Sequence, residues 1–175
     1  MNYKLETIDG YSPDHKSLYR GIAELVKSAN DTYPDWDNWF FHKFISGLKN
    51  GSRKMVVAYN NLDKPLGIAL LKDTAEEKKI CCLFVREDCR KSGIAKNLLK
   101  KSFAVLKTDK PLLTVSDKHL AELQKLLDKN NFTFSYKKKG AYKENNTENY
   151  FNNEATEILK KDILAPLFAR KLRQR

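Results

Sequence analysis

One segment constrains the fold of this chain more than any other: an apolar strand, a charged turn and a helix follow one another directly. Residues 79–85 read Lys-Ile-Cys-Cys-Leu-Phe-Val, and an unbroken apolar run of this length favours a central strand covered on both faces. Gly93 then stands at the start of an amphipathic helix that we predict from Ser92 to about Leu106. A buried strand that leads straight into a helix is typical of a layered α/β domain.

The residues on either side of this segment predict further strands and helices. Strand-like runs bounded by turn residues occur at 3–8, 54–59, 66–72, 112–115, 132–138 and 148–152. Helical spacing of apolar residues predicts helices from Pro13, from Asp35 to Leu48 and from Ser116 or Asp117 to Asn130. We therefore expect one α/β domain with a mixed sheet over residues 1–152. A helical extension with a basic tail should occupy residues 153–175.

Composition narrows the class of protein. With 41% hydrophobic residues in 175, the chain can bury the core of one domain, and intrinsic disorder is excluded. The longest apolar stretches fall far short of the roughly 20 residues of a membrane span, and no signal-peptide pattern opens the chain. We expect a cytoplasmic protein without membrane contact. Three clustered cysteines, Cys81, Cys82 and Cys89, lack a fourth ligand at metal-site spacing, so reduced buried thiols are expected rather than a metal.

The charge balance bears on possible partners. Lysine and arginine exceed aspartate and glutamate by 33 to 22, a net charge of +11, which favours polyanions such as RNA, the ribosome or a phosphorylated cofactor. The run Lys137–Lys139 and the tail Arg170–Arg175 are the candidate contacts. A solvated lysine-rich surface explains the same residues without any partner.

The start of the predicted helix has the chemistry of a phosphate cradle. Backbone N–H groups of a first helical turn point in one direction, and the helix dipole adds positive potential there. Gly93 allows a pyrophosphate to approach the backbone because it has no Cβ, and Ala95 keeps the next turn small. The Walker loop and the dinucleotide glycine motif are both absent from the sequence.

At these residues the sequence resembles the GNAT family of acetyl-CoA-dependent N-acetyltransferases. The family signature, Arg/Gln-x-x-Gly-x-Gly/Ala after the fourth strand, is matched by Arg-Lys-Ser-Gly-Ile-Ala at Arg90–Ala95. The resemblance extends from about Lys54 to Asn152 in the order of elements. It implies the GNAT fold, a mostly antiparallel central sheet with a splayed parallel strand pair, flanked by helices.

The resemblance also implies a cofactor site for acetyl-CoA as co-substrate. The end of the fourth strand would pair with the pantetheine arm, and the thioester would lie between Val85 and Ser116. The turn and helix start would hold the phosphates. The implied cofactor residues are Leu83, Phe84, Val85, Arg90, Lys91, Ser92, Gly93, Ile94, Ala95 and Lys96.

The catalytic residues depart from the family pattern. Alignment on Arg90 puts Lys79 where members have a base glutamate on the fourth strand. Alignment on Asn131–Phe132, where members usually read Gly-Phe, puts Leu127 at the position of a thiol-protonating tyrosine. Substitute acids and bases are sought nearby, and each has a structural alternative in a strand, turn or helix cap: Tyr142, Tyr150, Ser116 and Glu77.

The acceptor site and the function follow from the same resemblance. Trp36 and Trp39, beside Asp35 and Asp37, are candidate acceptor contacts, although the two acids equally suit a first helical turn. We expect acetyl transfer to an amine of a protein, a small molecule or an aminoacyl-tRNA. The alternative is a non-catalytic GNAT-fold module that binds CoA or nucleic acid. The apolar face of the C-terminal extension points to a possible homodimer.

Overall fold

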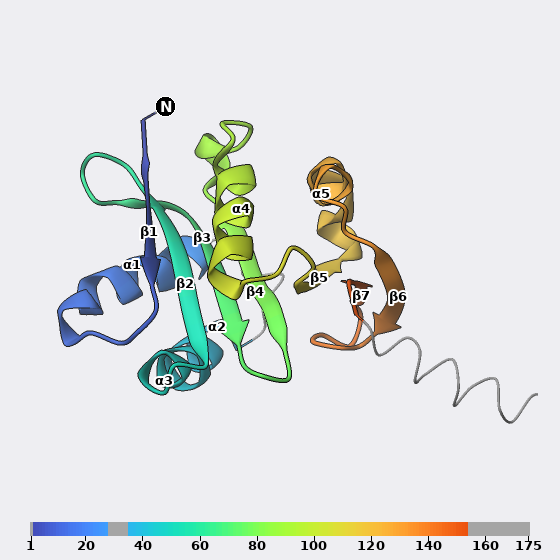
Figure 1. Cartoon of the computed structure of the whole chain (residues 1–175), viewed down its shortest axis with the longest axis horizontal. Coiled ribbons are helices and arrows are strands. Elements are labelled where there is room, and N and C mark those ends of the chain that lie inside the picture. The colour runs from blue at the N-terminus through green and yellow to red at the C-terminus, as the bar shows by residue number, and fades with distance from the viewer. Residues whose placement is uncertain (1, 28–34, 154–175) are drawn as a thin grey trace, which may run out of the picture.

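The computed structural model of the chain describes residues 2–27 and 35–153. Seven strands form one sheet in the order β1-β2-β3-β4-β5-β7-β6 (Figure 1). The strands are β1 (Lys4–Ile8), β2 (Arg53–Tyr59), β3 (Pro65–Asp73), β4 (Lys78–Val85), β5 (Leu112–Ser116), β6 (Phe134–Lys139) and β7 (Thr147–Phe151). The expected mixed α/β sheet is confirmed.

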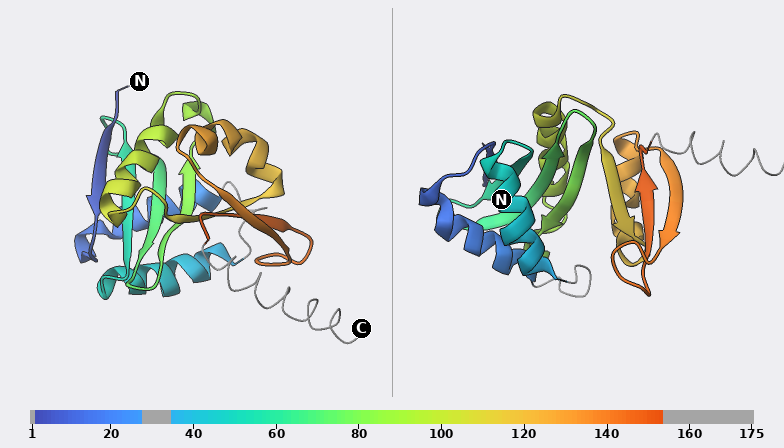
Figure 2. Two further views of the ribbon diagram at one scale, coloured as in Figure 1. Left: turned by 45° about the vertical axis from the view of Figure 1, so that its right-hand side comes forward. Right: turned by 90° about the horizontal axis from the view of Figure 1, so that it is seen from below.

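One strand pair is parallel and soon separates. All other neighbours in the sheet run antiparallel, whereas β4 and β5 pair in parallel at Lys79↔Leu112 and Ile80↔Leu113. Beyond Ile80 the two strands diverge, as Figure 2 shows in the view from below. The expected splayed parallel pair is therefore confirmed, and the later half of β4 has a strand partner on one side, β3.

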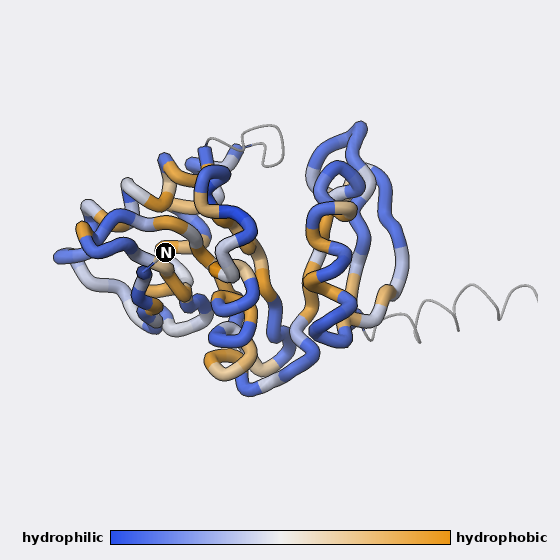
Figure 3. The backbone as a smooth tube through the Cα atoms, turned by 90° about the horizontal axis from the view of Figure 1, so that it is seen from above, coloured by the Kyte–Doolittle hydropathy of each residue, from blue (hydrophilic) through white to orange (hydrophobic). Residues whose placement is uncertain are grey.

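Alternation along the central strands divides the core between two faces. Met55 and Val57 of β2 belong to the cluster beneath α1 (Lys16–Lys27), α2 (Trp36–Asn38) and α3 (Ile45–Lys49), whereas Val56 and Ala58 belong to the cluster beneath α4 (Ile94–Leu106) and α5 (Asp117–Lys129). Side chains of a strand point alternately to opposite faces, so helices cover both sides (Figure 2). The apolar stretches consequently lie along the central strands and the inner helix faces (Figure 3).

The second predicted helix is not one regular α-helix. Between α2 and α3 the chain makes a π-helical turn, η2 (Trp39–Phe44). The wider turn places residues five apart together, and the rings of Trp39 and Phe44 lie 5.7 Å apart. Phe40 and Phe44 stack at 5.7 Å and are fully buried. Packing of large rings thus overrides the α-helical spacing that predicted an uninterrupted helix.

Several boundaries also differ from the predicted ones. The helix predicted from Ser92 begins at Ile94, because Lys91 and Gly93 both have positive φ, 61° and 86°. The strand predicted from Phe132 begins at Phe134, because the Phe132 N–H bonds back to the Leu127 carbonyl at the end of α5. A tight turn after the helix accounts for that delay.

Some predictions lie outside the described residues. These are Ala29, which is the last apolar residue at helical spacing in the helix predicted from Pro13, and the C-terminal extension with its apolar face and basic tail. Among the described residues, no helix has the length and apolar character to cross a membrane. The same residues include no group of three potential metal ligands, and Cys81, Cys82 and Cys89 form no disulfide with one another.

Candidate active site

The later half of β4 presents an open backbone edge. The Arg86 N–H donates to the Leu66 carbonyl of β3 at 2.9 Å, and backbone groups of a strand point alternately to its two sides. The backbone N–H and C=O groups of Phe84 therefore point toward β3, whereas those of Leu83 and Val85 point to the side from which β5 has diverged. The Val85 carbonyl accepts a hydrogen bond from Arg90 Nε there, at 3.5 Å. This edge can receive an extended ligand as an added strand.

The turn after β4 ends in a set of amides at the start of α4. The Asn97 N–H is the first to bond within the helix, to the Gly93 carbonyl at 3.1 Å, so the N–H groups of Gly93 to Lys96 precede it. A Cβ on Gly93 would meet nothing within 4 Å. Its positive φ explains the glycine, and the space before the amides is open to a ligand. Lys91, Ser92 and Lys96 are exposed around this space.

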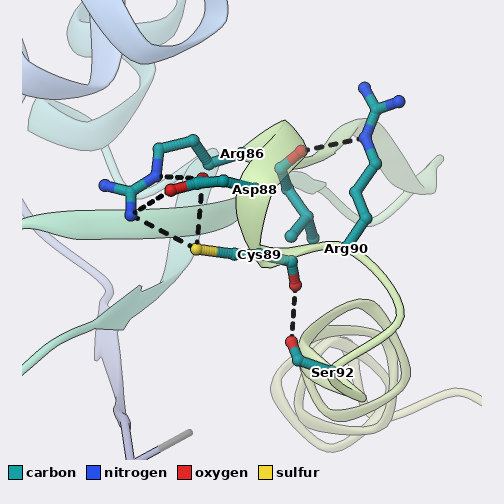
Figure 4. Close-up of polar contacts among 6 residues, drawn as sticks. Arg86, Asp88, Cys89, Arg90 and Ser92 are labelled. Carbon is teal, nitrogen blue, oxygen red and sulfur yellow. Dashed lines mark hydrogen bonds and ion pairs between the residues drawn. The ribbon is translucent and has the colours of Figure 1, made fainter.

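A network of side chains fixes the turn that precedes the amides (Figure 4). Arg86 bonds Asp88 at 2.5 and 2.9 Å and the Cys89 Sγ at 3.3 Å. The Arg86 guanidinium holds the pKa of the Asp88 carboxyl below its usual value, and burial raises the pKa of the Cys89 thiol. Ser92 Oγ donates to the Cys89 carbonyl at 2.5 Å. The turn that leads into these amides is thus held in one conformation.

A second polar group lies where β4 and β5 meet. Lys79 Nζ donates to the Tyr142 hydroxyl at 3.0 Å, and Thr114 Oγ1 lies 3.4 Å from the same hydroxyl. The loop between β6 and β7 carries Tyr142 across to this point, with half of its side chain exposed. Partial burial lowers the pKa of Lys79, but Tyr142 and the nearby Cys81 and Glu77 outweigh it, so the pKa is raised.

A β-bulge in β4 lies beside this group. Leu70 pairs with Cys82 and Leu71 with Ile80, which leaves Cys81 outside the register with β3. Cys81 Sγ accepts a hydrogen bond from Arg53 at 3.2 Å, and burial raises the pKa of the thiol. The bulge re-aims the backbone at the point where the strand pair opens.

Tyr150 and Glu77, two other catalytic candidates from the sequence, have different surroundings. Tyr150 is in register with Thr114 and stacks on Tyr136 at 4.5 Å, and burial together with Tyr142 raises its pKa to about 12. Glu77 lies in the turn before β4, where its carboxylate pairs with Lys72 at 2.7 Å. That ion pair engages Glu77 away from the β4–β5 opening.

The sequence analysis missed a carboxylate next to Ser116. Glu148 of β7 is in register with Ser116 of β5, and both residues are 5% exposed. Ser116 Oγ makes no hydrogen bond to any described residue, and it does not cap α5 although Ser116 is the N-cap residue. Burial raises the pKa of Glu148, Lys79 opposes that shift and Asp117 adds to it. The sequence predicted only a strand at residues 148–152 and gave no sign that Glu148 is buried.

The two tryptophans have different environments. Trp36 is 4% exposed, its indole N–H donates to the Ala23 carbonyl at 3.2 Å, and it belongs to the core. Trp39 is partly exposed and packs on Trp36 with ring centres 5.5 Å apart. Trp36 therefore supports the helix, and Trp39 is the ring that an acceptor could touch.

Comparison with known proteins identifies the family. A family model described as "Acetyltransferase (GNAT) domain" matches residues 31–141. No curated protein sequence matches the chain.

Solved structures share the fold at low sequence identity. A putative acetyltransferase of the GNAT family from Desulfovibrio desulfuricans is 13% identical, with TM-score 0.66, and the match covers 86% of this chain and 97% of that one. An aminoglycoside 6'-N-acetyltransferase complexed with coenzyme A is 14% identical, with TM-score 0.61 and coverage of 86% and 95%. Mutant forms of the spermidine/spermine N-acetyltransferase from Vibrio cholerae are 13% identical, with TM-score 0.60 and coverage of 86% and 93%.

Proposed function

Because the chain belongs to the GNAT family of acetyl-CoA-dependent acetyltransferases, we propose that it transfers acetyl from acetyl-CoA to a primary amine. The amine attacks the thioester directly. The observation that carries the proposal is the alignment of the open β4 edge with the amides at the start of α4. Such an arrangement suits a ligand with an extended amide-containing arm and a pyrophosphate.

The dimensions of β4 suit the arm of this co-substrate. With the pyrophosphate at the α4 N-terminus, the arm runs back along Leu83 and Val85 toward the β4–β5 junction. From Val85 to Lys79 the strand spans roughly 20 Å at about 3.3 Å per residue. The reacting carbonyl then lies toward the bulge at Cys81. A backbone N–H there is the proposed donor to the oxyanion.

Tyr142 is the proposed proton donor to the departing thiolate. Its hydroxyl lies over the junction of β4 and β5, 3.0 Å from the Lys79 ammonium. A cation that donates to a phenol oxygen orients the hydroxyl and stabilises the negative charge left when its proton is transferred. Tyr150, stacked on Tyr136 one strand away, is the second candidate.

The acceptor is proposed only as a primary amine. The aminoglycoside and spermidine enzymes among the similar structures support amine acceptors, and exposed Asp35 and Asp37 beside Trp39 could attract a cation. Contact with RNA remains a proposal that rests on the exposed run Lys137–Lys139 of β6 and on the C-terminal tail. A homodimer through the C-terminal extension is likewise a proposal.

The test is release of free CoA thiol from acetyl-CoA in the presence of a panel of amines. Wild-type protein should release thiol with at least one amine, and Gly93→Glu should not, because it adds bulk and negative charge in front of the amides. Gly51→Glu is the matched control, since Gly51 also has positive φ and open space around its Cβ position. Binding of acetyl-CoA without thiol release from any amine would favour a non-catalytic CoA-binding module instead.

A further inference from the structure

Glu148 is the described acid whose position is hardest to explain by folding alone. Its side chain is 5% exposed, although it lies on β7 next to an edge strand. Burying a carboxylate is costly unless it is paired with a cation, hydrogen-bonded or protonated. Its register partner on the neighbouring strand β5 is Ser116, whose buried hydroxyl makes no hydrogen bond to any described residue. Two buried polar groups thus adjoin on one face of the sheet.

That face is the one that carries the proposed proton donor. Thr114 and Ser116 alternate with the core residues Leu113 and Val115, so their side chains share one face of β5. Thr114 lies 3.4 Å from the Tyr142 hydroxyl, which identifies this face as that of Tyr142 and Lys79. Residues directly opposite in an antiparallel pair have Cβ atoms about 5 Å apart, so Glu148 adjoins Ser116 and lies on the same face as Thr114, two residues along β5.

Charged and titratable groups from each neighbouring strand and from α5 act on Glu148. Lys79 of β4 favours the charged carboxylate, whereas Asp117 at the start of α5 disfavours it. Lys138 is its register partner on β6, and Tyr150 lies two residues along β7. Glu77, the one carboxylate among the four candidates from the sequence, is paired with Lys72. Glu148 is therefore a buried carboxylate on the face of the Lys79–Tyr142 contact, and Lys79 favours its charged form.

We propose that Glu148 is the general base of the reaction and accepts the proton of the acceptor ammonium. This inference rests on the proposed acetyl transfer and names a residue for one of its steps. The ammonium gives one proton to the Glu148 carboxylate, and the neutral amine forms a C–N bond to the thioester carbonyl carbon. The C–S bond breaks, and the thiolate takes the proton of Tyr142. The second proton of the nitrogen restores Tyr142, and Glu148 releases its proton to water, so one proton is released in total.

The first test compares two amines that differ in protonation. Spermidine is cationic at pH 7 and requires a base, whereas hydroxylamine is largely neutral and does not. Glu148→Gln should lower kcat/KM for spermidine by about 10²- to 10⁴-fold and leave the hydroxylamine rate within about threefold. Glu144→Gln, an exposed acid on the β6–β7 loop, should change neither rate. An equal loss with both amines would overturn the assignment, because in the proposed mechanism Glu148 takes a proton only from the ammonium and the proton of the neutral amine goes to Tyr142.

The second test needs no acceptor and separates this inference from the proposed function. In ¹³C-glutamate-labelled protein, the carboxyl resonance that disappears in Glu148→Gln should titrate above the ordinary glutamate range. Lys79→Met should move its midpoint higher. A midpoint in the ordinary range would contradict the base assignment even where acetyl-CoA binds. Failure of acetyl-CoA to shift thermal unfolding of the wild type would instead refute the proposed function.

Discussion

The Lys79 ammonium lies 3.0 Å from the Tyr142 hydroxyl, although the two residues are 63 positions apart in the chain. The contact joins the start of β4 to the loop between β6 and β7. It therefore links the strand that forms the open edge to the hairpin that carries the proposed proton donor. The family's glutamate and tyrosine positions hold Lys79 and Leu127 here, and this pair offers a different route to protonation of the thiolate.

Removal of the Tyr142 hydroxyl should slow turnover without affecting cofactor binding. We expect Tyr142→Phe to lower kcat by about 10²-fold or more, while the thermal shift produced by acetyl-CoA is unchanged. Tyr150→Phe, which removes the hydroxyl of the tyrosine stacked on Tyr136, should retain most of the activity. Steady-state thiol release checks both. The reverse ranking of the two variants would assign the proton donor to Tyr150.

Lys79 should act through Tyr142. Lys79→Met retains much of the side-chain volume but removes the donor to the phenol oxygen, so kcat should fall while KM for acetyl-CoA changes little. In the Tyr142→Phe background the same substitution should have a much smaller effect, because coupled residues are not additive. Lys110→Met, an exposed lysine before β5, is the control. Additive losses in the double variant would show that Lys79 has a separate role.

Asp73 should make stability depend on pH. Its carboxylate contacts Lys78 and lies 2.6 Å from Lys54, with 12% of its side chain exposed. Burial alone would raise its pKa, but the two ammonium groups outweigh it and hold the pKa below the usual value. The stabilisation is therefore complete above the ordinary carboxyl pKa and is lost as pH falls through the lowered value.

The corresponding variant gives a measurable difference. Asp73→Asn should lower the free energy of unfolding at pH 7 by about 1–3 kcal/mol, and the difference should vanish in acid. Asp63→Asn is the matched control, because Asp63 pairs with Lys4 at 2.6 Å with a side chain 75% exposed, and exposed pairs contribute about 0–1 kcal/mol. Denaturant unfolding at a series of pH values from 7 down to about 2 measures both. Equal effects of the two variants would contradict the account.

Glu148 should have the opposite pH dependence. Since its pKa is raised by burial, the folded state holds this proton more tightly than the unfolded chain does, and stability decreases as pH rises through the raised pKa. Relative to Glu148→Gln, the wild type should lose stability as pH rises from the ordinary glutamate pKa through the raised value. Denaturant unfolding across that interval provides the measurement. A constant difference between the two proteins would indicate an unshifted carboxyl group.

Much of the fold could be predicted because it is encoded locally. The apolar run 79–85, the turn residues around Asn60 and the glycine before α4 each act over a few positions. The π-helical turn was missed because it arises from packing of Trp39 on Phe44, which outweighs the regular helical spacing. The start of β6 was misplaced because Phe132 bonds back to the end of α5.

The candidate site also has a part that the sequence could predict and a part that it could not. The residues proposed for the phosphates are contiguous, so one motif names them together. The Lys79–Tyr142 contact and the pairing of Glu148 with Ser116 depend on how distant strands align. No period in the sequence encodes those alignments, and burial of Glu148 could be recognised only once β5, β6 and β7 were in place.

The most direct measurement is thermal unfolding with and without acetyl-CoA, with desulfo-CoA and ATP as comparison ligands. At about 100 times its Kd, a ligand adds about 2.7 kcal/mol, roughly 5–10 °C for a domain of this size. The account predicts that rise for acetyl-CoA and desulfo-CoA in the wild type and in Gly51→Glu, and its loss in Gly93→Glu. An absence of any shift in the wild type, or an equal shift in Gly93→Glu, would contradict the proposed cofactor site at the start of α4.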